Sequence, residues 1–588
     1  MPSRISVSNL LFWCMAGYVL GPVSANAQTY SIVDLGTLPG GGNSYSTSIN
    51  NAGQVVGRCL TDSSNLIWHA TLWSGNTLTD LGTLGGKLSS ATGINDAGMI
   101  SGNSEDLTGF RPVTWNGTDQ TELATPPGAS GVAKGINNAG QVVGSTGNVA
   151  TIWNGTTPTY LYGPPGVWTE PGNAIGPFSD GDGINDRGEV VGSSTIPVNP
   201  DIVNGLAATV WNGTTPTQLD AVVPSGQGGA NAINDLGQVV GFNTAGGFNA
   251  SHATLWNGTT PTDLGVLAVI TSPTALDNVS SATAINNSGE VTGWSEVLGD
   301  LPVTDTLAFL YSGGRMTDLN ALIDPNDPLR QWVILSRGNG INDSGWIAAD
   351  GVSPSSLIAH AYLLVPVSFL PRTLDFASQK VGAQSTAQPV TITNTGTHPF
   401  AVSSISTSAD FSQQNNCQIS LPVGMTCTIQ VTFSPVGSGA RSGLLDIASG
   451  SAILTVALSG SAFIPIALEA SATSVTVGTP VMLTWASTSL ANCTATGGAT
   501  GDGWAGNLAS SGEKWVSESS TGQFDYTVRC AIAGASVQQQ VVVTNTSRPS
   551  GGGGALSYGS LVTLIGMIGF RYLRSPAVWN RRRSRLHI

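Results

Sequence analysis

The stretch Ile49-Asn50-Asn51-Ala52-Gly53-Gln54-Val55-Val56-Gly57 decides the fold, because close copies of it recur along the chain. The motif Ile-Asn-(Asn/Asp)-x-Gly occurs seven times, beginning at Ile49, Ile94, Ile136, Ile184, Ile233, Ile285 and Ile341. Asn and Asp bond to nearby backbone and Gly tolerates a positive φ, so the motif has the chemistry of a turn. Most copies continue into a short apolar run. Each copy therefore predicts a turn between two β-strands.

A second hairpin lies between successive copies of the motif. In one example, the runs His69–Trp73 and Thr77–Leu81 flank a Ser-Gly-Asn turn. A Trp-Asn-Gly-Thr string, which recurs at 115, 153, 211 and 256, supplies the Asn-Gly pair that favours tight hairpins. Each repeat of about 42 to 56 residues thus holds four short strands, which is the content of one propeller blade.

The two ends of the repeat region complement each other. The first unit starts with Tyr30–Leu35 and lacks the His-Ala-type strand, whereas the last unit ends with that strand, His360–Leu364, and has no partner after it. If these two strands pair, the ring closes and no sheet edge stays free. We therefore expect an all-β chain with a seven-bladed β-propeller over 28–367, in preference to an open solenoid.

The repeat region resembles the bacterial extracellular HAF-repeat family. The likeness rests on His69-Ala70-Thr71, His252-Ala253-Thr254, Leu307-Ala308-Phe309 and the run Asp80–Gly86. It implies an exported protein, but it brings no established chemistry to these residues.

Two immunoglobulin-like β-sandwiches are expected after the repeats. Period-two alternation predicts strands over 368–463, which resembles the choice-of-anchor D (ASH/Hydin-like) module in its Asn394-Thr395-Gly396 turn and Phe433-Ser434-Pro435. The region 464–545 alternates in the same way and resembles bacterial immunoglobulin-like domains. It departs from antibody domains because Trp485 precedes Cys493.

Both ends of the chain carry targeting features. Residues 1–27 read as a signal peptide, with Arg4, an apolar stretch and a small-x-small site that predicts cleavage between Ala27 and Gln28. A Gly-rich linker over 546–554 precedes an apolar segment and an Arg-rich end over 555–588, for which we expect a transmembrane helix. The order resembles a GlyGly-CTERM sorting signal, which implies processing near Gly551, Gly552, Gly553 and Gly554. A retained C-terminal membrane anchor is the alternative.

Five cysteines remain in the exported chain, where oxidising conditions favour disulfides. Proximity in sequence pairs Cys417 with Cys427 and Cys493 with Cys530, which leaves Cys59 unpaired. No cysteine spacing matches a zinc site. Acidic residues outnumber basic ones by 35 to 21, for a net charge of −14, so nucleic acid is not an expected partner.

Catalytic motifs are not found in the sequence. His69, His252 and His360 share one repeat position, and a residue repeated around a ring suits architecture better than a single active site. The Trp residues at 73, 115, 153, 211 and 256 are expected between blades, with sugar stacking as the alternative. The segment Asp180–Asp186 resembles a calcium loop, but Ile184 stands at a ligand position and the closing Glu is missing. We expect no cofactor, with calcium as a weak alternative.

These features predict a non-enzymatic, cell-surface or extracellular protein whose propeller binds an extracellular protein or glycan, with the sandwiches as a stalk. The protein would contact the membrane only through its C-terminal helix, before the tail is processed. The alternative is an extracellular propeller enzyme, a polysaccharide lyase or glycosidase. That function needs non-repeated acidic or basic residues at one mouth of the ring, and the atypical segments Tyr162–Gly183 and Asp318–Arg330 are the candidates. Two carboxylates within about 10 Å in a pocket there would favour the enzyme.

Overall fold

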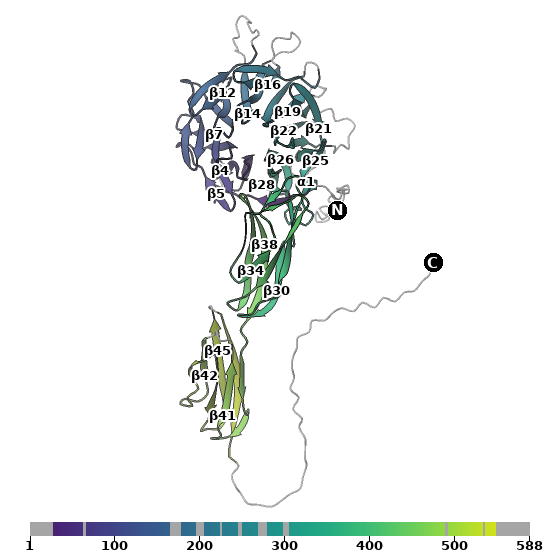
Figure 1. Ribbon diagram of the computed structural model, residues 1–588. Helices are drawn as coiled ribbons and strands as arrows, with labels where there is room; N and C mark the ends of the chain where they lie inside the picture. Colours follow the sequence, from purple (N-terminus) through teal and green to yellow (C-terminus); the bar gives the residue numbers. More distant parts are fainter. Residues whose placement is uncertain are drawn as a thin grey trace, which may run out of the picture. The chain divides into compact units, whose positions relative to one another are not determined.

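The protein, seen here as a computed structural model, is built almost entirely of β-strands (Figure 1). The structure describes residues 28–548, apart from 63–65, 165–177, 196–204, 224–225, 245–249, 268–278, 298–304, 488–491 and 533–534. The expected signal peptide with Ala27, the glycines 551–554 and the apolar tail lie outside the described residues. The chain divides into two compact units, the first running to Pro465 and the second made mostly of later residues.

The first unit opens with seven four-stranded antiparallel sheets. Sheet 1 is β2 (Ser44–Ile49), β3 (Val55–Leu60), β4 (Trp68–Ser74) and β5 (Thr77–Asp80), and sheet 2 is β6 (Ser89–Ile94), β7 (Met99–Glu105), β8 (Phe110–Asn116) and β9 (Asp119–Glu122). Sheet 3 is β10 (Gly131–Ile136), β11 (Val142–Thr146), β12 (Val149–Asn154) and β13 (Thr157–Leu161), and sheet 4 is β14 (Ser179–Ile184), β15 (Val190–Thr195), β16 (Leu206–Asn212) and β17 (Thr215–Gln218). Sheet 5 is β18 (Gly228–Ile233), β19 (Gln238–Thr244), β20 (Ser251–Asn257) and β21 (Thr260–Gly265), and sheet 6 is β22 (Ser280–Ile285), β23 (Val291–Glu296), β24 (Thr306–Ser312) and β25 (Arg315–Asp318). Sheet 7 is β26 (Ile334–Ile341), β27 (Ile347–Val352), β28 (Ala359–Val365) and β1 (Ser31–Asp34).

Sheet 7 joins the two ends of the repeat region. Strand β1 pairs antiparallel with β28, with Ser31 opposite Val365 and Asp34 opposite Tyr362, as the complementary ends of the sequence predict. The first strands of all seven sheets contact their neighbours on both sides, and β26 contacts β2. The seven sheets therefore form a closed ring, with these first strands innermost (Figure 1).

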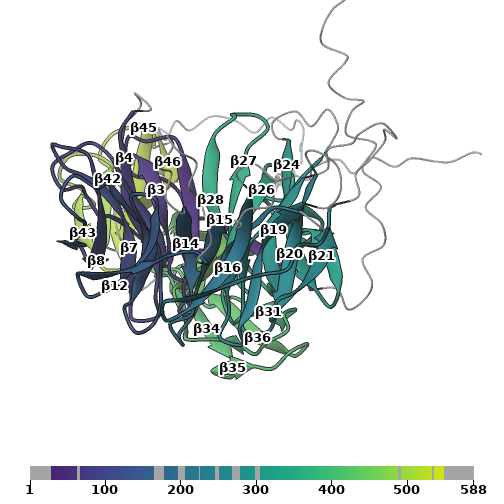
Figure 2. The same cartoon turned by 90° about the horizontal axis from the view of Figure 1, so that it is seen from above.

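The ring has two faces that differ in their connections. Because the strands within a sheet are antiparallel, successive connections alternate between the faces. One face, here called the turn face, carries the Ile-Asn turns after each innermost strand and, in sheets 1 to 6, the two-residue turns between third and fourth strands. The opposite face, here called the loop face, carries the connections between second and third strands, such as 147–148, and those that lead from one sheet to the next. Figure 2, turned by 90°, shows the strands of the ring from another side.

A β-sandwich follows within the same unit. One sheet holds β29 (Val367–Leu370), β31 (Gln388–Asn394), β36 (Thr426–Phe433) and β34 (Phe411–Asn415), and the other holds β30 (Thr373–Lys380), β38 (Ala452–Phe463), β37 (Gly439–Ser449) and β33 (Ser404–Thr407). A small third sheet pairs β32 (Phe400–Ala401) with β35 (Ser420–Leu421). The rings of Phe376, Phe411 and Phe433 pack together in the core. The Cys417–Cys427 disulfide is present in this sandwich.

The second unit contains another pair of sheets. One is β39 (Ala467–Ala470), β41 (Val481–Ala486) and β44 (Ser511–Val516), and the other is β40 (Ser474–Thr476), β46 (Ala535–Thr546), β45 (Gly522–Ile532), β42 (Asn492–Gly497) and β43 (Gly506–Leu508). Trp504 packs edge-on against both Trp485 and Tyr526. Cys493 and Cys530 are disulfide-bonded, while Cys59 in the ring is free and buried, which raises the pKa of its thiol to about 11.

One helical turn, α1 (Leu319–Leu322), was not expected from the sequence. Its N-cap, Asp318, accepts a hydrogen bond from the Asn320 backbone N–H, while Leu319 and Leu322 are buried. Tertiary packing of the two leucines thus stabilises a turn too short to have a helical period in the sequence. Over the described part of the chain, no helix has the length and apolar character needed to cross a membrane.

Candidate functional site

The seven Ile-Asn turns meet around the ring centre, where they line a cavity of about 200 Å³. Two closed cycles of hydrogen bonds join them. The motif Asn of each turn donates through Nδ2 to the carbonyl of its equivalent in the next sheet at 3.0–3.1 Å. The following residue donates its backbone N–H to the next side chain at 2.8–2.9 Å. Each repeated turn therefore reverses the chain and also joins its sheet to the next one by hydrogen bonds.

The carboxylates at this mouth are bonded within the cycle. The amides of Asn51, Asn138 and Asn287 each donate to two neighbouring aspartates. These aspartates are Asp96, Asp186, Asp235 and Asp343. Hydrogen bonds to these amides explain why acidic residues recur at this position, and the explanation needs no catalytic role.

A third cycle of contacts is interrupted at one place. Each innermost strand carries a β-bulge, and the bulged side chain at Thr47, Thr92, Asn231, Thr283 and Asn339 donates to a carbonyl of the next sheet. The remaining two bulged positions are occupied by Lys134 and Asp182. Here the ring has a site that is not repeated.

At the interruption, Lys134 Nζ contacts Asp180 Oδ2 and Asp182 Oδ1, both at 2.6 Å. Burial raises the pKa of Asp182, and Lys134 only partly offsets that effect. Burial disfavours the Lys134 ammonium, but the two carboxylates outweigh it and raise its pKa. Both carboxylates belong to the segment Tyr162–Gly183 and lie close together, as the enzyme hypothesis requires. However, the central cavity is lined by Asp186 and not by these two aspartates.

The same segment does not fit a calcium loop. Residues from Asp180 to Ile184 lie within strand β14, so their backbone is extended and does not curve around an ion. An ammonium group already lies between the two carboxylates, and Asp186 is engaged in the turn cycle. The likeness seen in the sequence is therefore one of composition and not of geometry.

The three repeated histidines each pair with an aspartate of the same sheet. The Nδ1–Oδ2 distances are 2.9 Å for His69–Asp80, 2.9 Å for His252–Asp263 and 2.8 Å for His360–Asp34. The contact with Asp34 raises the pKa of His360.

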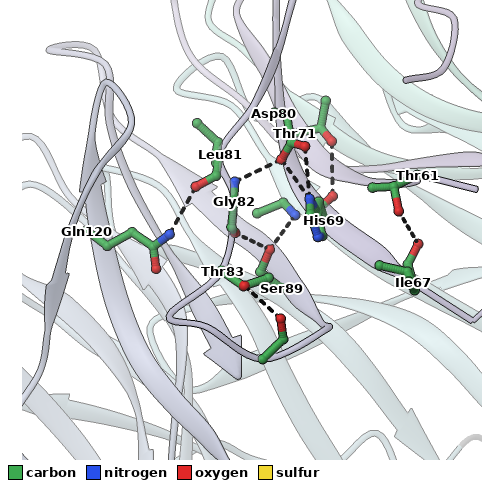
Figure 3. A network of polar contacts seen from close by, with 12 residues as sticks. Thr61, Ile67, His69, Thr71, Asp80, Leu81, Gly82, Thr83, Ser89 and Gln120 are labelled. Carbon is green, nitrogen blue, oxygen red and sulfur yellow. Dashed lines mark hydrogen bonds and ion pairs between the residues drawn. The ribbon is translucent and has the colours of Figure 1, made fainter. Parts of the chain in front are cut away.

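A serine lies near each His–Asp pair but does not complete a catalytic triad. Around His69, the Ser89 hydroxyl accepts from the Ala70 N–H and donates to the Gly82 carbonyl (Figure 3). Ser89 is buried, and it bonds backbone groups instead of the imidazole. Ser280 makes the same two contacts beside His252. The network joins one sheet to the next and repeats with it.

The Trp residues at 73, 115, 153, 211 and 256 are all buried, which rules out sugar stacking on their faces. Four of them donate through Nε1 to a carbonyl of the preceding sheet or its connection, at 2.8–3.0 Å. Trp73 is the exception, because its Nε1 has no hydrogen-bond partner among the described residues. It lines a second cavity of about 220 Å³ with Leu35, Leu363 and Ser451.

The sandwich occupies part of the turn face. The Ser451 N–H donates to the carbonyl of Ala52 in the first turn, and His398 Nε2 lies 2.9 Å from Ser288 Oγ in the sixth. The second atypical segment is also used here, since Asp327 forms an ion pair with the sandwich residue Arg372 at 3.0 Å and is almost fully buried. Asp318–Arg330 thus supplies a junction, in which Asp324 and Asp327 contact the sandwich residues Ser368 and Arg372, while Asp318 caps α1.

Exposed apolar side chains gather on the loop face. Ten large apolar residues of the described ring are exposed, namely Leu66, Leu107, Phe110, Val132, Tyr162, Leu236, Phe242, Trp332, Leu357 and Ile358. All except Leu236 lie in loop-face connections or in the halves of strands nearest to them. Sequence reasoning missed this asymmetry, although the variable spacing between motifs is its signal.

One segment of the chain matches a known protein family, and the chain as a whole has only weak similarity to solved structures. Residues 366–451 match the model of the HYDIN/CFA65/VesB-like, Ig-like domain. No curated protein matches the chain. Among solved structures, the secreted serine protease VesC from Vibrio cholerae shares 11% identity at a TM-score of 0.16, covering 44% of this chain and 63%, less than two thirds, of its own. The Yersinia pseudotuberculosis adhesin InvE shares 12% identity at 0.16, covering 30% and 58%. A fungal alcohol oxidase of the AA5 family shares 12% at 0.30, covering 74% and 100%. The sandwich at residues 366–451 is thus a HYDIN/CFA65/VesB-like, Ig-like domain.

Proposed function

We propose that this chain is an exported, non-enzymatic binding protein whose ring is a seven-bladed β-propeller of the HAF-repeat type that holds a protein partner on its loop face. The observation that carries the proposal is the placement of nine of the ten exposed apolar side chains on that face. We take this one-sided distribution of exposed apolar side chains as the mark of an interaction face. The sandwich meets the ring at the other face, so the loop face is left open to a partner.

Export is supported by the disulfides, which persist in oxidising compartments. On this proposal the Ig-like domains act as a stalk, and the C-terminal tail sorts the protein to the cell surface or anchors it there. A protein partner is preferred to a glycan because leucine, isoleucine and valine supply most of the exposed apolar residues, whereas sugar binding relies on aromatic faces and polar groups.

The test compares two matched variants on arrays of extracellular proteins and glycans. Leu107 is 91% exposed on the loop face and Leu236 is 69% exposed on the turn face, so neither Leu107→Ser nor Leu236→Ser should disturb the core. The unmodified exported chain should bind array proteins, and Leu107→Ser alone should weaken that binding. Equal weakening by both variants, or binding to glycans only, would refute the proposal.

An extracellular propeller enzyme is the second candidate, and the non-repeated cluster of Lys134, Asp180 and Asp182 favours it. An acid and a base acting on a glycosidic bond must differ in protonation and reach a bound sugar. Release of reducing sugars from polysaccharides by the chain, lost in Asp182→Asn, would support this candidate. No release across a panel of neutral and acidic polymers would exclude it for that panel.

A further inference from the structure

The second cavity, of about 220 Å³, lies where three parts of the first unit meet. Sheet 7 contributes Val33 and Leu363 to its wall, and sheet 1 contributes Trp73 and Leu78. The hairpin between β37 and β38 of the sandwich contributes Ser451. Because the sandwich supplies part of the wall, this cavity is not a repeated feature of the ring.

Trp73 lacks the hydrogen bond that the equivalent residues make in the next four sheets. In sheet 2, Trp115 donates from Nε1 to the Leu81 carbonyl at 3.0 Å. Leu35 is the equivalent of Leu81, because each follows an aspartate and donates its N–H to an alanine carbonyl of the third strand in its sheet. Leu35 also lines the cavity, yet Trp73, which is 3% exposed, donates from Nε1 to no described residue. A buried donor without an acceptor is unfavourable, so this wall favours a ligand that supplies the missing amide carbonyl.

A second polar group in the cavity wall also lacks a partner. The Ser451 Oγ atom is buried and makes no hydrogen bond within the part of the chain that the structure describes. It lies beside another lining residue, Gly53, since a Cβ on Gly53 would be 3.2 Å from it. A hydroxyl oxygen can accept a hydrogen bond from an N–H group. The cavity therefore offers a donor for a carbonyl and an acceptor for an N–H, and a secondary amide needs both.

The rest of the wall has an apolar interior and a polar rim. The apolar side chains are those of Val33, Leu35, Leu78, Leu363 and Ile453. The exposed lining residues are all polar, namely Asp34, Asn76 and Thr77. The volume is below the range of about 300 to 1,000 Å³ that holds drug-sized ligands, so the cavity suits one small group. A peptide would bury further backbone amides against the apolar side chains without partners, whereas the hydroxyl groups of a sugar can stay at the rim.

We infer that this cavity binds the acetamido group of an N-acetylated amino sugar. The acetamido carbonyl accepts from Trp73 Nε1, the acetamido N–H donates to Ser451 Oγ, and the methyl group packs against the apolar wall. The sugar hydroxyls bond to Asp34, Asn76 and Thr77 at the rim. The ligand uses the edge of the Trp73 ring and not its buried face. The site involves turns of the turn face, so the inference goes beyond the partner proposed for the loop face and does not depend on it.

The experiment titrates the exported chain with N-acetylglucosamine and with glucose, which has a hydroxyl in place of the acetamido group. We expect isothermal titration calorimetry to show about tenfold tighter binding of N-acetylglucosamine. Trp73→Phe keeps an aromatic ring but removes the donor, so it should weaken N-acetylglucosamine binding about tenfold and leave glucose unchanged. Ser451→Ala should weaken the same sugar selectively. Trp153→Phe is the matched control, because Trp153 donates to the Ala124 carbonyl and does not line this cavity.

Saturation-transfer NMR gives a second measurement that needs no variant. The strongest transfer should reach the acetyl methyl protons of N-acetylglucosamine, because that group packs against the apolar wall. Equal binding of the two sugars, transfer confined to the sugar-ring protons, or binding unchanged by both Trp73→Phe and Ser451→Ala would overturn the inference. Tighter binding of an N-acetylated amino-acid methylamide would overturn it in favour of a peptide. Leu107→Ser should leave sugar binding intact, so a failure here is distinguishable from a failure of the proposed function.

Discussion

Replacing Lys134 by Met should destabilise the ring because it leaves two carboxylates without their shared cation. The side chains are 29% exposed at Lys134, 25% at Asp180 and 26% at Asp182, so the site lies between a surface pair and a buried one. Exposed pairs contribute about 0–1 kcal/mol, whereas breaking a buried pair costs about 3–5 kcal/mol. We therefore expect a loss of about 2 kcal/mol in the free energy of unfolding at pH 7.

The loss of unfolding free energy in Lys134→Met should grow as the pH rises. Burial already raises the pKa of Asp182, and removing Lys134 raises it further. A carboxyl with a raised folded pKa lowers stability when it ionises, so the penalty is absent at low pH and appears as pH rises through that pKa. The deficit of Lys134→Met should therefore be smaller at pH 4 than at pH 7. Urea unfolding of the exported chain, followed by tryptophan fluorescence, measures both values.

The matched rescue uses residues that the other sheets already carry. In Lys134→Thr/Asp180→Ser/Asp182→Asn, each new residue is one found at the equivalent position elsewhere, as in Thr92 and Ser90 of sheet 2 and Asn231 of sheet 5. Thr and Asn at the bulge should donate to the next sheet, as Thr92 does to the Ala133 carbonyl at 3.1 Å. This variant should regain most of the lost stability. If Lys134→Met costs nothing at pH 7, or if the triple variant is equally destabilised, the reasoning is wrong.

Three further outcomes are expected. Burial raises the pKa of Asp350 to about 6, so its ionisation should lower the free energy of unfolding by about 3 kcal/mol between pH 4 and pH 7. Chemical denaturation at each pH should show this loss in the unmodified chain and not in Asp350→Asn. Trp153→Phe should cost about 1 kcal/mol more than Trp73→Phe, because only Trp153 donates from Nε1 to a carbonyl; equal costs in denaturation would contradict this. Replacing Cys417 and Cys427 by Ser should lower the stability of the first sandwich by about 2–3 kcal/mol, seen by calorimetry as a shift of one transition while the others stay in place.

The sequence by itself determined the number of sheets and their local chemistry. The Ile-Asn turns and the two-residue hairpins depend on residues close together in the chain, so their spacing predicts four strands per repeat. The pairing of β1 with β28 was also predictable, because each end of the repeat region lacks the strand that the other supplies. Repetition likewise explained the histidine and tryptophan positions before any geometry was known.

Only the tertiary structure decided which side chains meet across the sheets. Lys134 reaches carboxylates 46 and 48 residues away, and Asp327 meets Arg372 at the junction with the sandwich. Lys134 and Asp182 share a repeat position, but the sequence does not show that the bulge turns their side chains toward each other. The Asp327–Arg372 pair follows no period, because it depends on how closely the ring and the sandwich approach. The sequence also could not show on which face of the ring the exposed apolar side chains lie. A sequence shows which residues are apolar, but the docking of the sandwich on the turn face determines which of the ring's two faces stays open to water.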